Sequence, residues 1–432
     1  MAPDVTLDAA WLASRRWFRH KTQPIASVRV EDAAPLGEGC SLLVLAVQLA
    51  SGEQVRYFMP AAGSGHDLHE PADGDGAWRT LLAWLATPES RVASEQGAFV
   101  AYPAPALERM LPGGAQEAAG LEERRLSVQQ SNTSVRLGER LILKLYRLVE
   151  PGVNPEVEIS SFLDAAGFRH VPPVAGWIEY CPAEASAATA MVQGLVPARG
   201  DAWEWMLDRL GAQSRGPAEA LAAVAQLGGI TAELHAALRS RPDAPGFEAG
   251  PATQDDLAAW RAGAERQLAA AQDAVRGVDA ERLKRLAPGA QRALDAIPRT
   301  SGAIRSRIHG DLHLGQLLAT ESGFVVVDFE GEPARPLGER RLPASPLRDV
   351  AGMLRSLDYA ARTVEREAGS ADLSAWLGDA RAAFLAAYGD AADADLLRAF
   401  EVEKACYEVR YEANNRPDWV WLPLQALERL VA

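Results

Sequence analysis

The sequence predicts an α+β fold in which a β-rich first half is followed by a large, mainly helical second half. Short strand-like runs lie between residues 26 and 195, whereas long Ala- and Leu-rich amphipathic patterns dominate after Asp201. One apolar run, Phe324 to Val327, interrupts the helices and is too short for a helix. We therefore expect a strand hairpin there, with polar residues at both ends.

Composition and charge restrict the class of protein. The chain has 432 residues, 48% of them hydrophobic, which is enough to bury more than one core. Its formal net charge of -14 argues against binding to a nucleic-acid backbone, which needs clustered Lys and Arg. We expect neither a signal peptide nor a stretch of roughly 20 apolar residues that would span a membrane, and hence a cytoplasmic location. Cys40, Cys181 and Cys406 are odd in number and far apart, which predicts reduced thiols.

The elements follow from hydrophobic periodicity. Alternation from Ala26 to Pro60 predicts a small antiparallel sheet, and a helix is expected from Ala77 to Leu85. Further strands are expected around 125–128, 135–137, 141–145 and 176–180, with a helix over 154–166. Amphipathic helices are expected near 216–240, 253–276, 346–366, 372–388 and 393–413. Turn-rich stretches before residue 120 indicate a domain boundary near residue 100.

The hairpin region carries a set of residues suited to phosphoryl transfer. The run His309-Gly310-Asp311-Leu312-His313-Leu314-Gly315-Gln316 is followed by Asp328 at the end of the apolar strand. Such a reaction needs a carboxylate that accepts the acceptor's proton and oxygen ligands that hold Mg²⁺ against ATP. Asp311 suits the first role, and Gln316 with Asp328 suits the second. Each residue alone is also common in turns and caps, so the spacing of the set carries the prediction.

The sheet-rich half supplies candidates for ATP binding. A polar turn between two predicted strands can present backbone N–H groups to phosphate oxygens, and it contains Ser131, Asn132, Thr133 and Ser134. The alternative is an ordinary polar hairpin turn.

Lys144 lies within an apolar strand, where an isolated cation is costly unless an anion meets it. Glu156 and Glu158 follow on the next helix, and Glu158 is our choice as the partner of Lys144. The segment from Met191 to Leu195 joins the two halves, so the backbone near Gln193 and Leu195 is our candidate for contact with adenine.

These motifs resemble the aminoglycoside phosphotransferase-like kinases, and more closely the actinobacterial maltokinases and glucosamine kinases. The matching segments are Trp11-Leu12 with Arg16-Trp17-Phe18, Gln130 to Val135, Ile308 to Gln316, Asp328 to Pro333 and Ser345 to Gly352. The resemblance implies a bilobal eukaryotic-kinase-like fold with an N-terminal cap domain (1–100), an N-lobe (101–195) and a helical C-lobe (196–432). It also implies Asp311 as base and Gln316 and Asp328 as magnesium ligands. Glu330 is a third metal candidate, or else a partner of Arg335 or Arg348.

A polar and aromatic tract from Tyr407 to Pro423 resembles a sugar site. Our candidates for substrate contact are Asp311, His313, Glu408, Glu412, Asn415, Asp418 and Trp419. Glu408 and Glu412 are four residues apart and share one helix face, which makes that face acidic. Asn415 and Asp418 make this tract more acidic than the maltokinase pattern, and an extra carboxylate favours an ammonium group. Asp418 has alternatives as a helix cap or as a partner of Arg416.

This acidic tract favours glucosamine as the acceptor, and for glucosamine the resemblance implies glucosamine 6-phosphate and ADP as products. The alternative is maltose, giving maltose 1-phosphate. Further alternatives are an aminoglycoside acceptor and a non-catalytic nucleotide-binding pseudokinase, although Lys144, Asp311 and Asp328 are all present. A protein kinase is disfavoured because the Gly-rich loop and the His-Arg-Asp motif are missing. We expect a monomer or homodimer without nucleic-acid or membrane partners.

Overall fold

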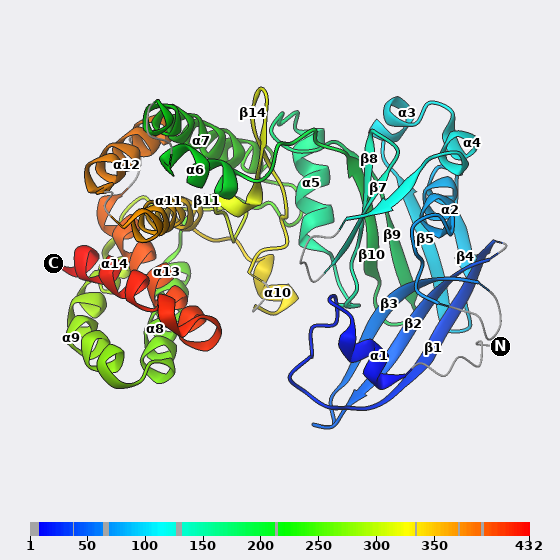
Figure 1. Cartoon of the computed structure of the whole chain (residues 1–432), viewed down its shortest axis with the longest axis horizontal. Helices are drawn as coiled ribbons and strands as arrows, with labels where there is room; N and C mark the ends of the chain where they lie inside the picture. Colours follow the sequence, from blue (N-terminus) through cyan, green and yellow to red (C-terminus); the bar gives the residue numbers. More distant parts are fainter. Residues whose placement is uncertain are drawn as a thin grey trace. The chain divides into compact units, whose positions relative to one another are not determined.

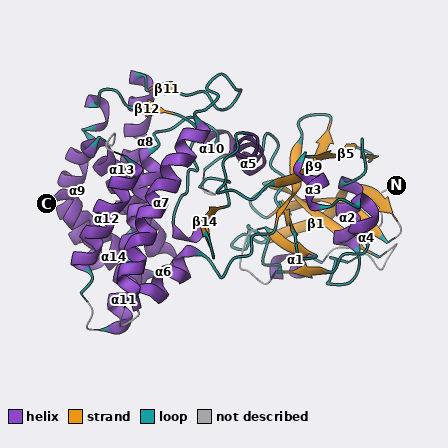
Figure 2. Ribbon diagram, turned by 90° about the horizontal axis from the view of Figure 1, so that it is seen from above, coloured by secondary structure: helices purple, strands orange, loops and turns teal. Residues whose placement is uncertain are grey.

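The computed structural model describes residues 8–37, 39–63, 69–126, 132–211, 215–332, 335–369, 372–389 and 393–432. The chain forms two compact units. The first comprises residues 1–164 and 172–196, and the second comprises residues 165–171 and 197–432. Strands gather in the first unit and helices in the second (Figure 2). This arrangement confirms the predicted α+β fold class.

The first unit begins with a three-stranded antiparallel sheet, here called the N-terminal sheet. Its strands are β1 (Ile25–Gly37), β2 (Cys40–Leu49) and β3 (Gln54–Ala62), in that order (Figure 1). Alternate residues of β2 point to opposite faces, and both faces are buried. Leu42 and Val44 pack with helix α2 (Ala77–Leu85). Leu43 and Leu45 pack on the other face with Trp17, which follows the short helix α1 (Ala9–Ser14) in the sequence. The predicted sheet and the predicted helix from Ala77 are both confirmed.

A larger sheet of seven strands follows in the same unit, in the order β4-β5-β9-β10-β8-β7-β6. Its strands are β4 (Arg91–Ala93), β5 (Gly97–Pro103), β6 (Glu123–Arg125), β7 (Thr133–Leu137), β8 (Leu141–Leu145), β9 (Val174–Pro182) and β10 (Ala187–Gly194). The boundary that we expected near residue 100 falls inside β5. Because β5 pairs with β9 along its whole length, this strand belongs to the larger sheet.

Three further helices of the first unit are α3 (Ala106–Met110), α4 (Gly114–Ala119) and α5 (Pro155–Ala165). Helix α5 corresponds to the helix expected over 154–166. The side chain of Asn154 accepts hydrogen bonds from the backbone N–H groups of Glu156 and Val157, which fixes where the first turn begins.

The second unit is built from long helices. They are α6 (Ala202–Gly211), α7 (Gly216–Leu238), α8 (Gln254–Ala274), α9 (Gly277–Leu294), α10 (Leu337–Arg340), α11 (Leu347–Ala368), α12 (Ser374–Tyr388), α13 (Ala394–Asn415) and α14 (Trp421–Val431). Five of them match the amphipathic segments that we expected. Helix α9 was not expected: it contains Pro288, which normally interrupts a helix because it lacks an N–H donor.

The strand hairpin predicted between the helices is present. It consists of β13 (Leu317–Thr320) and β14 (Gly323–Val326), which pair in antiparallel fashion. A second short pair joins β11 (Gly250–Pro251) to β12 (Ile304–Arg305). The β13–β14 hairpin lies between two polar segments, Ile308 to Gln316 before it and Asp328 to Glu332 after it. The hairpin therefore brings together the two segments that carry the predicted chemistry.

One element differs from the expectation about membranes. Among the described helices, α7 is long and apolar enough to cross a membrane by length and composition, and half of its most apolar window is buried within the structure. The core helices of globular proteins have the same character. Helix α7 packs against α6 and α12.

All three cysteines lie within the described residues and are free. Cys40 and Cys406 are buried, whereas Cys181 in β9 is half-buried. Burial raises the pKa of the Cys40 thiol to about 12, and it also raises the pKa values of Cys181 and Cys406. The three cysteines therefore form no disulfide with one another in this structure.

Candidate active site

The loop that carries Asp311 is anchored to helix α11 through one buried carboxylate. Asp349 accepts hydrogen bonds from the backbone N–H groups of His309 and Gly310, at 2.8 and 2.9 Å. It also contacts His235 Nε2 at 3.1 Å. Helix α11 approaches this loop so closely that a Cβ atom at Gly352 would lie 2.5 Å from the carbonyl oxygen of Leu312. Asp349 and Gly352 belong to a motif that sequence reasoning quoted without giving either residue a role.

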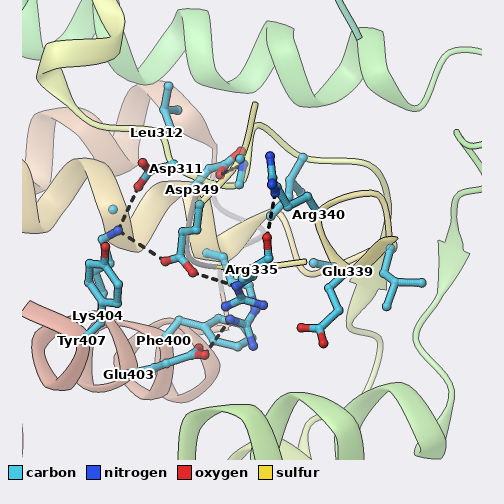
Figure 3. A pocket seen from close by; sticks show the side chains of 18 of the residues that line it. Asp311, Leu312, Arg335, Glu339, Arg340, Asp349, Phe400, Glu403, Lys404 and Tyr407 are labelled. Carbon is cyan, nitrogen blue, oxygen red and sulfur yellow. Dashed lines mark hydrogen bonds and ion pairs between the residues drawn. The ribbon is translucent and has the colours of Figure 1, made fainter. Parts of the chain in front are cut away.

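The Asp311 side chain lies in a pocket of the second unit and faces a lysine (Figure 3). Lys404 Nζ, from α13, is 3.1 Å from Asp311 Oδ1 and 3.6 Å from Glu332 Oε1. It also lies 4.7 Å from the centroid of the Tyr407 ring. Arg335 pairs with Glu332 at 2.7 Å on the other side. The predicted base is therefore held by a cation that sequence reasoning missed.

The opposite charges around Lys404 shift one another's pKa values toward the charged forms. Burial alone would lower the pKa of Lys404, but Asp311 and Glu332 raise it above its ordinary value. Burial alone would raise the pKa of Glu332, whereas Lys404 and Arg335 bring it below its ordinary value. Lys404 and Glu332 are therefore both charged near neutral pH, and Lys404 presents its positive charge to Asp311.

Replacing Lys404 by Met should lower kcat by about 10- to 100-fold, the value of a hydrogen bond to a charged group. The reason is that Asp311 loses the group that fixes its carboxylate. Steady-state kinetics check this, with Lys404→Arg expected to retain part of the activity. Lys284→Met, on the exposed face of α9, is the control and should leave kcat unchanged. Wild-type kcat in Lys404→Met would contradict the role.

The three residues predicted to bind metal lie at the base of the hairpin. Gln316 ends a short 3-10 helix (Leu314–Gln316), and its carbonyl oxygen accepts a hydrogen bond from the N–H of Val327, next to Asp328, at 2.9 Å. Asp328 has a φ of 67°, in the left-handed region that Asp tolerates better than most residues. A carboxylate oxygen of Asp328 and one of Glu330 lie within 4.8 Å of each other. Such a half-buried pair of carboxylates fits the oxygen ligands that Mg²⁺ prefers.

The structure also gives the contacts of His313 and of the two arginines that were considered as partners of Glu330. His313 Nδ1 accepts a hydrogen bond from the N–H of Gly315 at 3.1 Å and so caps the 3-10 helix. Burial lowers the pKa of His313, which favours its neutral form. Arg335 and Arg348, the alternative partners considered for Glu330, pair with Glu332 and Glu403 at 2.7 Å each.

In the first unit, Lys144 of β8 meets a buried carboxylate, as its position predicted, but the partner differs from our choice. Lys144 Nζ is 2.6 Å from Glu156 Oε2, which also accepts a hydrogen bond from Tyr146 at 2.8 Å. Glu156 is 2% exposed, whereas Glu158 is half-buried. The choice of Glu158 is thus corrected to Glu156, because the start of α5 at Pro155 turns Glu156 toward the sheet.

We expect Glu156→Gln to raise the KM for ATP by about tenfold or more, since Lys144 loses its countercharge and its fixed position. Glu158→Gln is the matched control, with the same chemical change two residues later on the same helix. Its KM should stay within about twofold of the wild type. Initial rates at varied ATP distinguish the two. Equal effects of both substitutions on the KM for ATP would contradict a specific role of Glu156.

The polar turn lies beside Lys144. Ser134 is directly opposite Lys144 in the pairing of β7 with β8, and Thr133 is opposite Leu145. Asn132 and Thr133 are buried, and Ser134 is half-buried. Ser131 lies outside the described residues. The three described turn residues and Lys144 therefore lie at one end of one pair of strands.

The segment proposed to contact adenine ends the last strand of the first unit. Gln193 belongs to β10, and the N–H of Leu195 donates to the carbonyl oxygen of Arg140 at 2.7 Å. The chain leaves this unit immediately afterwards, after Val196. Gln193 and Leu195 thus lie at the connection between the two units, as the sequence predicted.

The C-terminal tract is less acidic than its sequence indicates. Glu408 accepts from Arg355 at 2.7 Å, and Glu412 accepts from Arg416 at 2.6 Å. These arginines neutralise the face that the spacing predicted to be acidic. Burial, the largest influence on Glu408, raises its pKa although Arg355 opposes this. The alternative pairing of Asp418 with Arg416 is not favoured, because Arg416 binds Glu412.

The remaining substrate candidates follow α13. Asn415 and Asp418 are exposed, and Asn415 donates to the Tyr411 carbonyl oxygen at 2.8 Å. Trp419 is half-buried, with the guanidinium groups of Arg366 and Arg416 at 4.8 and 5.3 Å from its ring centroid. Of the predicted substrate residues, Asp311 lines the pocket of Figure 3. The candidates of the C-terminal tract follow Tyr407 in the sequence and are not among the described residues that line this pocket: Glu408, Glu412, Asn415, Asp418 and Trp419.

Comparisons with known proteins agree with this geometry. The model of the phosphotransferase enzyme family matches residues 122–399, and that of the maltokinase N-terminal cap domain matches residues 11–93. A glucosamine kinase of Streptacidiphilus jiangxiensis is 31% identical over 94% of this chain and 91% of the relative. A glucosamine kinase of Mycolicibacterium smegmatis is 29% identical over 93% of this chain and 98% of the relative.

Solved structures give the same result. The structure of a glucosamine kinase in complex with glucosamine, ADP and inorganic phosphate is similar with a TM-score of 0.75 and 28% identity. The similarity covers 99% of this chain and 100% of that chain. The chain belongs to the phosphotransferase enzyme family and is an ATP-dependent phosphotransferase that acts on an alcohol group.

Proposed function

We propose that this protein phosphorylates glucosamine with ATP, giving glucosamine 6-phosphate and ADP. The observation that carries the proposal is the end-to-end similarity to a glucosamine kinase, 31% identical over 94% of this chain. The geometry of the second unit supports the same reaction, because Asp311 lies in an open pocket beside a fixed cation. We further propose that the reaction takes place in the cytoplasm, where ATP is available.

In the proposed mechanism, Asp311 accepts the proton of the sugar 6-hydroxyl. The hydroxyl oxygen then forms a bond to the γ-phosphorus of ATP as the bond between that phosphorus and the β,γ-bridging oxygen breaks, and ADP leaves. Lys404 holds Asp311 in place through its contact at 3.1 Å.

Gln316, Asp328 and Glu330 are the residues that would hold Mg²⁺. Their side-chain oxygens are the donor type that this ion prefers, and Asp328 and Glu330 lie within 4.8 Å of each other. When bound, the ion would neutralise the negative charge of the phosphate oxygens.

Residues of the first unit are proposed to bind the nucleotide. Lys144, fixed by Glu156, would contact the phosphates. Ser131, Asn132, Thr133 and Ser134 would contribute the turn around them, and the backbone at Gln193 and Leu195 would contact adenine.

Recognition of the sugar is proposed to involve His313 and the C-terminal tract. Since Arg355 and Arg416 already neutralise Glu408 and Glu412, Asp418 is the exposed carboxylate best suited to a sugar ammonium group. Asn415 and Trp419 would contribute a hydrogen bond and a ring face.

We expect the purified protein, with ATP and Mg²⁺, to release ADP at least about tenfold faster with glucosamine than with glucose, the value of one charge-assisted contact. The panel should also contain maltose and an aminoglycoside, with products identified by mass spectrometry. Asp311→Asn protein serves as the blank for contaminating kinases. Turnover of maltose without glucosamine would contradict the proposal.

Maltose is the second candidate acceptor. The specific observation in its favour is the match of residues 11–93 to the maltokinase N-terminal cap domain. A maltose product phosphorylated at the anomeric position would resist reducing-sugar reagents, whereas glucosamine 6-phosphate would react. The same panel therefore separates the two functions.

A further inference from the structure

The strand that carries Lys144 continues onto the N-terminal sheet. After β8, the N–H of Phe58 donates to the carbonyl oxygen of Arg147 at 2.7 Å, and the N–H of Val149 donates to Arg56 at 2.9 Å. Tyr57 and Leu148 form an antiparallel bridge between these bonds. The segment from Arg147 to Val149 thus pairs with the edge of β3. Lys144 is therefore only three residues before a segment that is hydrogen-bonded to the N-terminal sheet.

The side chain of Arg147 reaches in the opposite direction, to the polar turn. Its Nε donates to Thr133 Oγ1 at 2.9 Å, and its Nη2 donates to Glu70 Oε1 at 2.5 Å. The guanidinium lies 4.7 Å from the centroid of the Trp17 ring and is completely buried. Burial lowers the pKa of Arg147 to about 10, although the charge of Glu70 opposes this. A buried guanidinium of this kind needs its carboxylate to remain in place.

Glu70 is the anchor of this arrangement. Its Oε1 also accepts from Trp17 Nε1 at 2.9 Å and lies 3.1 Å from Arg125 Nη2 of β6. The Glu70 side chain is 5% exposed. One carboxylate therefore joins the residues before the N-terminal sheet, the strand after Lys144 and the first strand of the polar turn. All of these groups belong to the first unit, whereas Asp311 belongs to the second.

We propose that Glu70 and Arg147 are positioning residues through which the N-terminal sheet fixes Thr133 for binding of the nucleotide phosphates. The proposal rests on the proposed function, in which the turn containing Thr133 binds ATP. The bond from Arg147 to Thr133 Oγ1 fixes the first residue of β7, which is 3% exposed, and so holds in place the adjacent Ser134, which lies directly opposite Lys144. The N-terminal sheet thereby gains a role in nucleotide affinity without contacting the nucleotide.

The test compares two glutamates on the N-terminal half of the first unit. Glu70→Gln removes the countercharge of Arg147. Glu31→Gln is the matched control: Glu31 is 8% exposed and pairs with Arg56 at 2.8 Å, a different arginine from the one that holds Thr133. For each full-length variant, calorimetry measures the Kd for ADP, kinetics measure the KM for ATP and for the sugar, and a thermal scan measures the Tm.

We expect Glu70→Gln to weaken ADP binding and to raise the KM for ATP by about tenfold, the loss of one hydrogen bond to a charged group, with an unchanged KM for the sugar. Glu31→Gln should bind ADP like the wild type. Equal falls in Tm for both variants with wild-type ADP affinity would overturn the proposal, because the link would then serve folding alone.

Two substitutions of Thr133 keep the test decisive if Glu70→Gln does not fold. Thr133→Val should weaken ADP binding about tenfold, Thr133→Ser should restore it, and Glu70→Gln should add little to Thr133→Val in the double variant. Wild-type ADP affinity in Thr133→Val would overturn the proposal. A wild-type protein that binds ADP but phosphorylates no sugar would contradict the proposed function and leave the ADP comparison valid.

Discussion

Asp311→Asn should lower kcat by about 10²- to 10⁴-fold, the range that a positioned general base contributes. The amide retains the shape of the side chain but cannot accept the proton of the sugar hydroxyl. Because Asp311 belongs to the second unit, whereas Lys144 and the described residues of the proposed phosphate-binding turn belong to the first, ADP affinity should remain close to the wild-type value.

Single-turnover kinetics and ADP titration of the same preparation separate the two effects. A further comparison with Asp328→Asn is informative, since loss of a metal ligand should weaken the dependence of the rate on Mg²⁺, whereas Asp311→Asn should keep it. Turnover of Asp311→Asn within about tenfold of the wild type would remove Asp311 from the role of base.

Asp349→Ala should lower the free energy of unfolding by about 3 kcal/mol or more and should also reduce kcat. The backbone N–H groups of His309 and Gly310 lose their acceptor in a buried environment, at a cost of about 1–3 kcal/mol each. The loop that positions Asp311 then loses its attachment to α11. Chemical denaturation measures the stability, with Asp395→Asn on the exposed side of α13 as the control.

Asp349 should also make the free energy of unfolding depend on pH. Burial alone would raise the pKa of Asp349, but its bonds with His235 and Gly310 hold it below its ordinary value. A lowered folded-state pKa means that the stabilisation is fully present above the unfolded value, about 3.9, and is lost as the pH falls through the folded value. The stability difference between wild type and Asp349→Ala should therefore be largest above about pH 5 and should shrink below about pH 4. A difference that is constant with pH would contradict this assignment.

Local patterns predicted much of the fold. The N-terminal sheet follows from short apolar runs between turns, and β2 is apolar on both faces because Leu42 and Val44 face one core and Leu43 and Leu45 face the other. The hairpin β13–β14 follows from a β-branched run that is too short for a helix. Both signals depend only on neighbouring residues, which is why the sequence carries them.

The partners in the site could not be predicted in the same way. Lys404 and Asp311 are 93 residues apart, and no periodicity relates them. Glu156 and Glu158 differ only in helical phase, which the cap at Asn154 sets and which composition does not reveal. Spacing alone places Glu408 and Glu412 on one face of α13, but Arg355 on α11 reaches Glu408 from another helix, 53 residues away. Such tertiary contacts decide which charges remain available.

The distribution of the thiols has a practical meaning. Two of them, Cys40 and Cys406, are inside the protein and are kept as thiols by burial, whereas Cys181 on β9 is within partial reach of solvent. Alkylating reagents act on the thiolate, so slow labelling at elevated pH is directed to this position. The native chain therefore carries its own attachment point for a fluorophore, on the sheet that contains Lys144 and in a unit separate from the one that contains Asp311.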